Sequence, residues 1–118
     1  MPITLNWIKC DENAWCDFLN VNLAHSHFDG MEGVYVIWHG GAPPNVVRVG
    51  QGVIRDRIMQ HRQDLQILAY SGYGLFVTWA SVLSNQTDGV ERYLGDKLAP
   101  KVGERQPDVI PIQVNLPW

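Results

Sequence analysis

Cysteine is scarce in this chain: Cys10 and Cys16 are the only two among 118 residues. The chain is also too long to be a mini-protein held together by disulfides. We therefore expect both cysteines to be small apolar residues, buried in a reducing compartment. A zinc site that joins them to His25 and His27 is the alternative, but that spacing matches no common ligand pattern.

Charge is also sparse. Charged residues make up 18% of the chain, and 9 basic against 12 acidic side chains give a net charge of -3. A nucleic-acid partner would therefore have to be bound by a local basic patch rather than by the field of the whole molecule. The 46% hydrophobic content and the five tryptophans exclude a disordered, collagen-like or coiled-coil chain. We expect one domain over residues 1–118.

A secretory leader and a membrane span are both missing from the sequence pattern. The first ten residues show no basic leader followed by an apolar stretch, so a cytoplasmic location is expected. Residues 65–87 carry no charge, but the turn-forming Ser71-Gly72-Tyr73-Gly74 interrupts them. A helix end, a turn and a buried strand fit this stretch better than a span, and we expect no membrane partner.

Apolar periodicity predicts alternating short strands and helices. The spacing of apolar residues and turn formers predicts strands at 3–8, 34–38, 46–49, 75–83 and 109–114, and helices at 11–20, 54–67 and 88–99. The strands at 34–38 and 46–49 should form a hairpin, and Pro111 should place the last strand at a sheet edge. This order predicts the α+β class, with helices packed on a small, mainly antiparallel sheet.

Positive charge is concentrated in one window. Arg48, Arg55, Arg57 and Arg62 face only Asp56 there, a local charge of +3 in an acidic chain. Two glycines just before a helix allow backbone N–H groups to approach an anion, and the helix N-terminus adds a partial positive charge. We therefore predict a phosphate-binding site. Its substrate-binding residues are predicted to be Arg48, Gly50, Gln51, Arg55 and Arg62.

Several motifs follow one another in a familiar order. They are Gly33-Val34-Tyr35, Arg48-Val49-Gly50, Arg57 and His61 four residues apart, Glu91 on the next helix, and Pro100. In order and spacing these resemble the GIY-YIG endonucleases, over about residues 31–103. The resemblance implies a three-stranded antiparallel sheet flanked by helices, with extra N- and C-terminal segments.

The resemblance also implies a chemistry. Tyr35 would help to activate water, Arg57 would hold the scissile phosphate of DNA, and Glu91 would bind one Mg²⁺ or Mn²⁺ ion. His61 would be a second group able to move the proton, so the predicted catalytic residues are Tyr35, Arg57, His61 and Glu91. One carboxylate suffices for Mg²⁺ because the ion keeps several waters. Nucleases of this kind usually gain specificity from a DNA-binding region, so a partner subunit or a homodimer is expected.

Two positions depart from the family pattern. Arg48 stands where the family has its second tyrosine, and Gly103 stands where an asparagine often follows the proline. The alternative function is therefore a catalytically impaired module that binds nucleic acid or another phosphate ligand. A third function is a protein-interaction domain that uses exposed tryptophans such as Trp118.

Each site residue also has an ordinary structural interpretation. Tyr35 can be a core aromatic with its hydroxyl at the surface. Glu91 follows Asp88 by three residues, the spacing of a capping box. Arg57 and His61 can belong to a solvated helix face.

Overall fold

The computed structural model describes residues 3–103 and 107–118. Its sheet has four antiparallel strands in the order β1-β4-β2-β3. They are β1 (Cys16–Asp17), β2 (Glu32–His39), β3 (Asn45–Val53) and β4 (Leu75–Ser81). The predicted α+β class is confirmed, and the predicted hairpin is β2–β3.

The expected three-stranded sheet is wrong, because the short strand β1 pairs with β4. Cys16 lies opposite Val77, and Asp17 lies opposite Phe76. The apolar spacing of residues 11–20 predicted a helix there, but the segment forms a 3-10 turn (Asp11–Asn13) and β1. The turn contains a residue with positive φ, Glu12 at 58°, which a continuous α-helix does not accommodate.

The three helices are α1 (Ile54–His61), α2 (Leu65–Leu68) and α3 (Thr87–Leu98). The predicted helix 54–67 is divided, because Asp64 starts α2 with its carboxylate as the N-cap acceptor for the Gln66 N–H, at 2.9 Å. Two further 3-10 turns lie at Ser26–Phe28 and Ser71–Tyr73. Among the helices that the structure describes, none is long and apolar enough to cross a membrane.

The predicted strands at 3–8 and 109–114 do not form. The two segments instead meet through a single parallel bridge between Ile3 and Val114. Pro111 cannot donate a hydrogen bond to a neighbouring strand. The segment around it packs beside α3 instead, and the Ile112 N–H donates to the Gly89 carbonyl at 2.9 Å.

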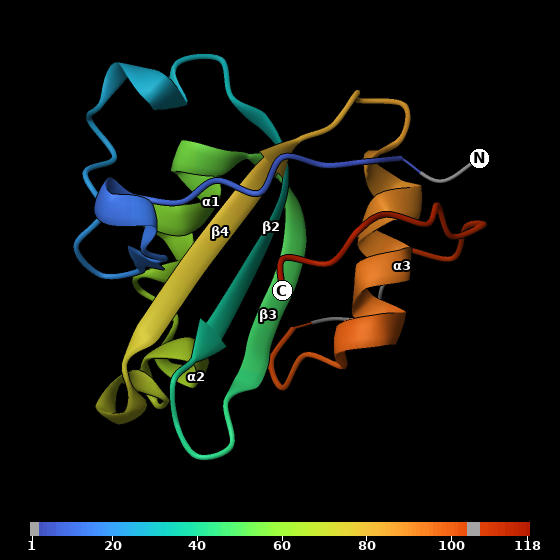
Figure 1. Ribbon diagram of the computed structural model, residues 1–118. Helices are drawn as coiled ribbons and strands as arrows, with labels where there is room; N and C mark the ends of the chain where they lie inside the picture. Colours follow the sequence, from blue (N-terminus) through green and yellow to red (C-terminus); the bar gives the residue numbers. More distant parts are fainter. Residues whose placement is uncertain (1–2, 104–106) are drawn as a thin grey trace.

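Both faces of the sheet are covered (Figure 1). One core cluster contains Tyr35 and Ile37 of β2 with buried residues of α1 and α2, and the N-terminal segment closes it with Phe18 and Phe28. The other cluster lies on the opposite face, under α3 and the two terminal segments. Burial on both faces explains why β2 is apolar almost throughout rather than alternating.

The cysteines form a disulfide, so their interpretation as free buried residues is wrong. The 3-10 turn between them brings the Cα atoms of Cys10 and Cys16 to 5.1 Å. Cys16 is fully buried, whereas Cys10 is exposed. The disulfide uses both sulfur atoms, so the cysteines are not available as the thiolate ligands that the zinc alternative needs.

Candidate active site

Tyr35 and His61 form a buried pair. Tyr35 projects from β2 towards α1 and is 1% exposed, and His61 is the last residue of α1 and 5% exposed. The tyrosine hydroxyl lies 2.6 Å from His61 Nε2, so it donates to that nitrogen when the ring proton is on Nδ1. Two of the four predicted catalytic residues are therefore in direct contact.

A glycine makes room for this tyrosine. Gly50 lies opposite Tyr35 in the β2–β3 register, and a Cβ atom on Gly50 would overlap the Tyr35 hydroxyl. In the same unbroken register Arg48 lies opposite Ile37. Alternate strand residues point to the same side, so Arg48, Gly50 and Tyr35 share one face of the sheet.

Two guanidinium groups influence the pair. Burial raises the pKa of Tyr35 above its ordinary value of 10.0, and the positive charges of Arg48 and Arg57 oppose that rise. Burial also lowers the pKa of His61 to about 4, and the same arginines add to the shift. Gly52 lets Arg57 lie close to the backbone of β3: a Cβ atom there would be 2.7 Å from Arg57 Nε. Neutral His61 therefore lies near two positive charges, and the negative charge of Asp64 opposes their effect on its pKa.

The acidic part of the site lies on α3. The Gln51 amide donates to Asp88 and also to Glu91 Oε2, the latter at 3.2 Å. Burial raises the pKa of Glu91 and the Gln51 hydrogen bond lowers it, while Asp88 raises it further. Two carboxylates thus converge on one amide.

These groups meet at the edge of the sheet. β3 is the edge strand, with α1 and α2 on one side and α3 standing beside it (Figure 1). Backbone N–H groups of Lys101 and Val102 donate to the carbonyls of Val46 and Val47, at 3.1 and 2.7 Å, and so cover one half of that edge. The charges of Arg48 and Arg57 also lower the pKa of Glu91, so the edge brings phenol, guanidinium and carboxylate within electrostatic reach.

Seven of the nine predicted site residues share this neighbourhood, and two do not. The seven are Tyr35, Arg48, Gly50, Gln51, Arg57, His61 and Glu91. Arg55 donates to the carbonyls of Leu23 and His25 and pairs with Asp29 at 2.8 Å. Arg62 donates to the carbonyls of Phe18 and Val21, at 2.9 and 2.7 Å. Their hydrogen bonds fasten the N-terminal segment, so neither belongs to the candidate site.

Arg62→Ala is expected to destabilise the protein by about 2–3 kcal/mol, because two carbonyl groups lose charged donors. Urea denaturation followed by circular dichroism measures this change. Arg57→Ala is the matched control, since Arg57 is exposed and, among the described residues, its side chain hydrogen-bonds only to Gln60, at 3.3 Å. It should change the free energy of unfolding by less than about 0.5 kcal/mol. Equal losses in the two variants would contradict this assignment.

The pKa of His61 predicts a pH dependence of stability. In the unfolded chain His61 has a pKa near 6.5, and in the folded protein its pKa is about 4. Between these two pH values the unfolded chain binds a proton that the folded protein does not. The stabilisation is therefore complete above pH 6.5 and is lost as the pH falls towards 4, by about 3 kcal/mol. Gln at this position keeps a polar partner for Tyr35 but does not titrate. Urea midpoints between pH 7 and 4 should therefore fall less for His61→Gln than for the parent protein, and parallel curves would contradict the prediction.

Asp88 is a residue that the sequence interpretation missed. The spacing of Asp88 and Glu91 offers a capping box as the structural alternative to a metal site, but α3 begins at Thr87 after Gln86 and has no side-chain cap. The capping interpretation is therefore wrong. The three-residue spacing of Asp88 and Glu91 was the available signal, because it places both side chains on one helix face.

No protein-family model matches this chain, and no curated protein or solved structure matches it either. The resemblance to the GIY-YIG endonucleases therefore rests on the order and spacing of the motifs. The geometry at the edge of β3 adds a spatial argument to that resemblance.

Proposed function

We propose that the chain is a Mg²⁺- or Mn²⁺-dependent endonuclease of the GIY-YIG type that hydrolyses DNA phosphodiester bonds. One observation carries the proposal: Tyr35, Arg57 and Glu91 come from a strand and two helices, and their side chains all lie against residues 50–52 of β3. Three such groups together match the needs of phosphodiester hydrolysis, which are a proton acceptor, a phosphate ligand and a metal ligand.

The residues present fit a divalent cation. Glu91 and Asp88 offer carboxylate oxygens. Both carboxylates accept a hydrogen bond from the Gln51 amide, so they converge at one point. Oxygen ligands suit Mg²⁺ and Mn²⁺, and Mg²⁺ needs only one or two protein carboxylates. When bound, the ion would supply Lewis-acid stabilisation of a phosphate oxygen.

The cationic residues would bind the substrate phosphate. Arg57 is exposed, and among the described residues neither Arg57 nor Arg48 forms an ion pair. Arg48 Nε is a buried donor without an acceptor in the described part of the chain. A phosphate group beside these two guanidinium groups would gain charge-assisted hydrogen bonds.

Tyr35 would move the proton, and His61 would position its hydroxyl. Because His61 has a pKa of about 4, its ring is neutral near neutral pH, and with the ring proton on Nδ1 its Nε2 atom accepts a hydrogen bond from the Tyr35 hydroxyl and orients it. The same low pKa makes His61 a weak base, so its role is to position the hydroxyl. Arg48 and Arg57 oppose the rise in the pKa of Tyr35 and would favour its phenolate, which would accept a proton from the attacking water.

Plasmid nicking tests the proposed activity. Purified protein should convert supercoiled plasmid to the open-circular form when Mg²⁺ or Mn²⁺ is added, and EDTA should stop the conversion. Arg57→Ala should slow nicking by about 100-fold through lost stabilisation of the phosphate. Absence of nicking with either metal, or equal nicking in EDTA, would overturn the proposal.

The second candidate function is binding without cleavage. It is favoured by Arg48, which occupies the position of the family's second tyrosine and adds a cation beside Tyr35. This candidate predicts DNA binding that weakens with salt and needs no metal, and Arg57→Ala should reduce the salt slope by about 1. Affinity that does not change between 50 and 500 mM salt would contradict it. A partner subunit or a second copy of the chain remains our proposal for how either activity gains specificity.

A further inference from the structure

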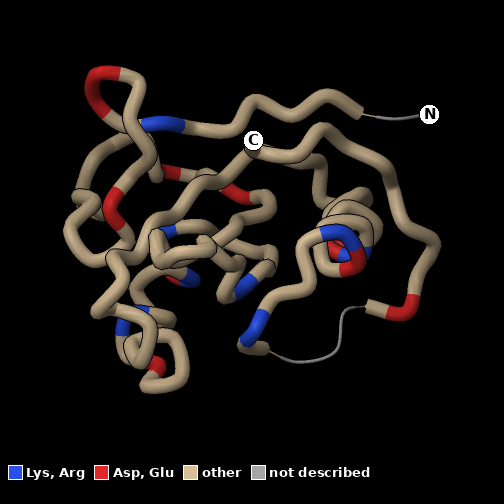
Figure 2. Tube along the Cα trace, turned by 60° about the horizontal axis from the view of Figure 1, so that its bottom comes forward, with Lys and Arg blue, Asp and Glu red and all other residues tan. Residues whose placement is uncertain are grey.

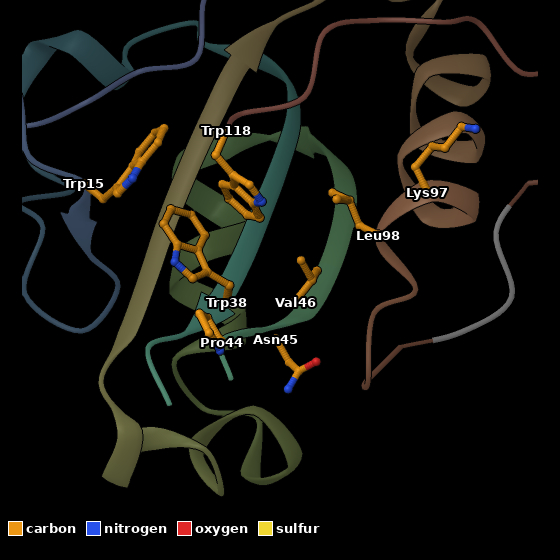
Figure 3. Close-up of a pocket in the computed structure, with 8 residues that line it drawn as sticks. All are labelled: Trp15, Trp38, Pro44, Asn45, Val46, Lys97, Leu98 and Trp118. Carbon is orange, nitrogen blue, oxygen red and sulfur yellow. The ribbon is translucent and has the colours of Figure 1, made fainter. Parts of the chain in front are cut away.

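A hollow walled by tryptophans lies away from the candidate active site (Figure 3). Its volume is about 420 Å³, within the range of about 300–1,000 Å³ that is typical of ligand pockets. The Trp15 and Trp38 rings are 5.3 Å apart, and Trp118 lies 4.8 Å from Trp38. Trp118 is 57% exposed. A large part of its indole surface is therefore open to a ligand.

The rest of the lining restricts the chemistry of that ligand. Pro44, Val46 and Leu98 add apolar surface, Asn45 adds one amide, and Lys97 is the only charged residue in the lining. Aromatic pockets that bind cations attract them with ring faces, but here Lys9 Nζ already lies 4.6 Å from the centroid of the Trp15 ring. The charges of Lys9 and Lys97 would repel a further cation. A flat, apolar group that carries negative charge beside it fits better.

The hollow and the candidate active site are built on the same two elements. In β3, Val46 of the hollow precedes Gln51 by five residues, which is about 17 Å of strand. In α3, Leu98 follows Glu91 by seven residues, or about 10 Å and two helical turns, so both lie on one face. At about 3.4 Å per nucleotide of a duplex strand, these spans correspond to roughly three to five nucleotides.

Basic side chains without ion-pair partners lie near the hollow and near the candidate active site. Figure 2 shows basic residues spread over several elements rather than gathered in one large patch. Among residues 3–103 and 107–118, Lys97 and Lys101 form no ion pair, like Arg48 and Arg57. The stem of Lys97 lines the hollow. Its ammonium group points away from the three tryptophans (Figure 3) and lies 5.7 Å from the centroid of the Tyr93 ring. The Lys101 N–H donates to the carbonyl of Val46, so Lys101 lies at the edge of β3, the strand that carries Arg48.

We propose that the hollow binds an unpaired base of the nucleic-acid strand whose phosphate lies at the edge of β3. The base stacks on the exposed face of Trp118, and Lys97 attracts the adjacent phosphate. Every base has an aromatic face, so this contact favours unpaired nucleotides without selecting a sequence. The inference rests on the proposed function, and it adds a preference for DNA with a flap, bulge or gap over fully paired DNA.

Binding measured without cleavage tests the subsite. Fluorescence anisotropy in EDTA compares a labelled duplex with the same duplex carrying a short unpaired stretch. The protein should bind the second at least about tenfold more tightly, and Trp118→Ala should remove that preference while leaving the affinity for the full duplex unchanged. Circular dichroism confirms that the variant is folded, which the exposure of Trp118 favours.

Tyr73→Ala is the matched control, because Tyr73 is also an exposed aromatic residue, 61% exposed, and does not line the hollow. It should retain the preference. Equal affinities of the parent protein for the two DNAs, or an unchanged preference in Trp118→Ala, would overturn the subsite, and the tryptophans would then serve only to cover the sheet. A Trp118-dependent preference without nicking in Mg²⁺ or Mn²⁺ would keep the subsite and reject the nuclease. Metal-dependent nicking without a preference for unpaired DNA would keep the nuclease and reject the subsite.

Discussion

Glu91→Gln is expected to abolish metal-dependent nicking, with a loss of at least about 100-fold in rate. The substitution keeps the size of the side chain and can still accept from the Gln51 amide, but it removes the negative charge that would hold the cation. Glu91 is half-buried on α3, so the variant should remain folded. A time course of plasmid conversion with Mg²⁺ and with Mn²⁺ measures the effect.

Glu12→Gln is the control for the loss of one negative charge. Glu12 is exposed in the N-terminal 3-10 turn, where no proposed site residue lies. The Glu12→Gln variant should therefore nick DNA at the rate of the parent protein. If Glu91→Gln nicked DNA as fast as this control, Glu91 would not be the metal ligand.

Gly50→Ala is expected to cost about 1–3 kcal/mol of stability and to reduce nicking by at least about tenfold. The added methyl group would overlap the Tyr35 hydroxyl, and the ring has no free space because Tyr35 is 1% exposed. Relief of the overlap must move the tyrosine or the strand, which is the ordinary cost of overpacking a core. It must also disturb the contact between Tyr35 and His61. Urea denaturation and the nicking assay measure the two effects.

Gly72→Ala distinguishes this mechanism from a general effect of replacing glycine. No atom lies within 4 Å of a Cβ built on Gly72, so this variant should keep the stability and the nicking rate of the parent protein. Similar losses in both variants would mean that backbone freedom, rather than the packing of Tyr35, explains the result.

The central part of the fold was predictable because its signals are local. The hairpin, the strand after the Ser71–Gly74 turn and the helix ahead of Pro100 follow from β-branched runs, turn formers and apolar spacing. The prediction of a helix over 11–20 was wrong because the apolar residues of that segment pack on the sheet from a turn and a short strand. Tertiary contacts, which periodicity does not encode, decide that segment.

The sequence predicted most of the residues of the candidate site, but not the contacts that these residues make. Motif order selected Tyr35, Arg57 and Glu91, and strand register then placed Gly50 beneath the phenol. Arg55 and Arg62 were grouped with them by sequence charge alone. Their carbonyl partners lie 32 and 44 residues away along the chain, and no local pattern reveals such partners. The Cys10–Cys16 bond was missed because an expected reducing compartment argued against it.

Layers on both sides of the strands have a consequence for how any nucleic acid could dock. Some RNA-binding modules use a bare sheet as a flat platform on which bases lie. Here the buried clusters occupy both sides of the strands, so no such platform is open. Contact is left to the rim, where the outermost strand and the neighbouring helix end, and recognition there depends on a few protruding groups rather than on a broad surface.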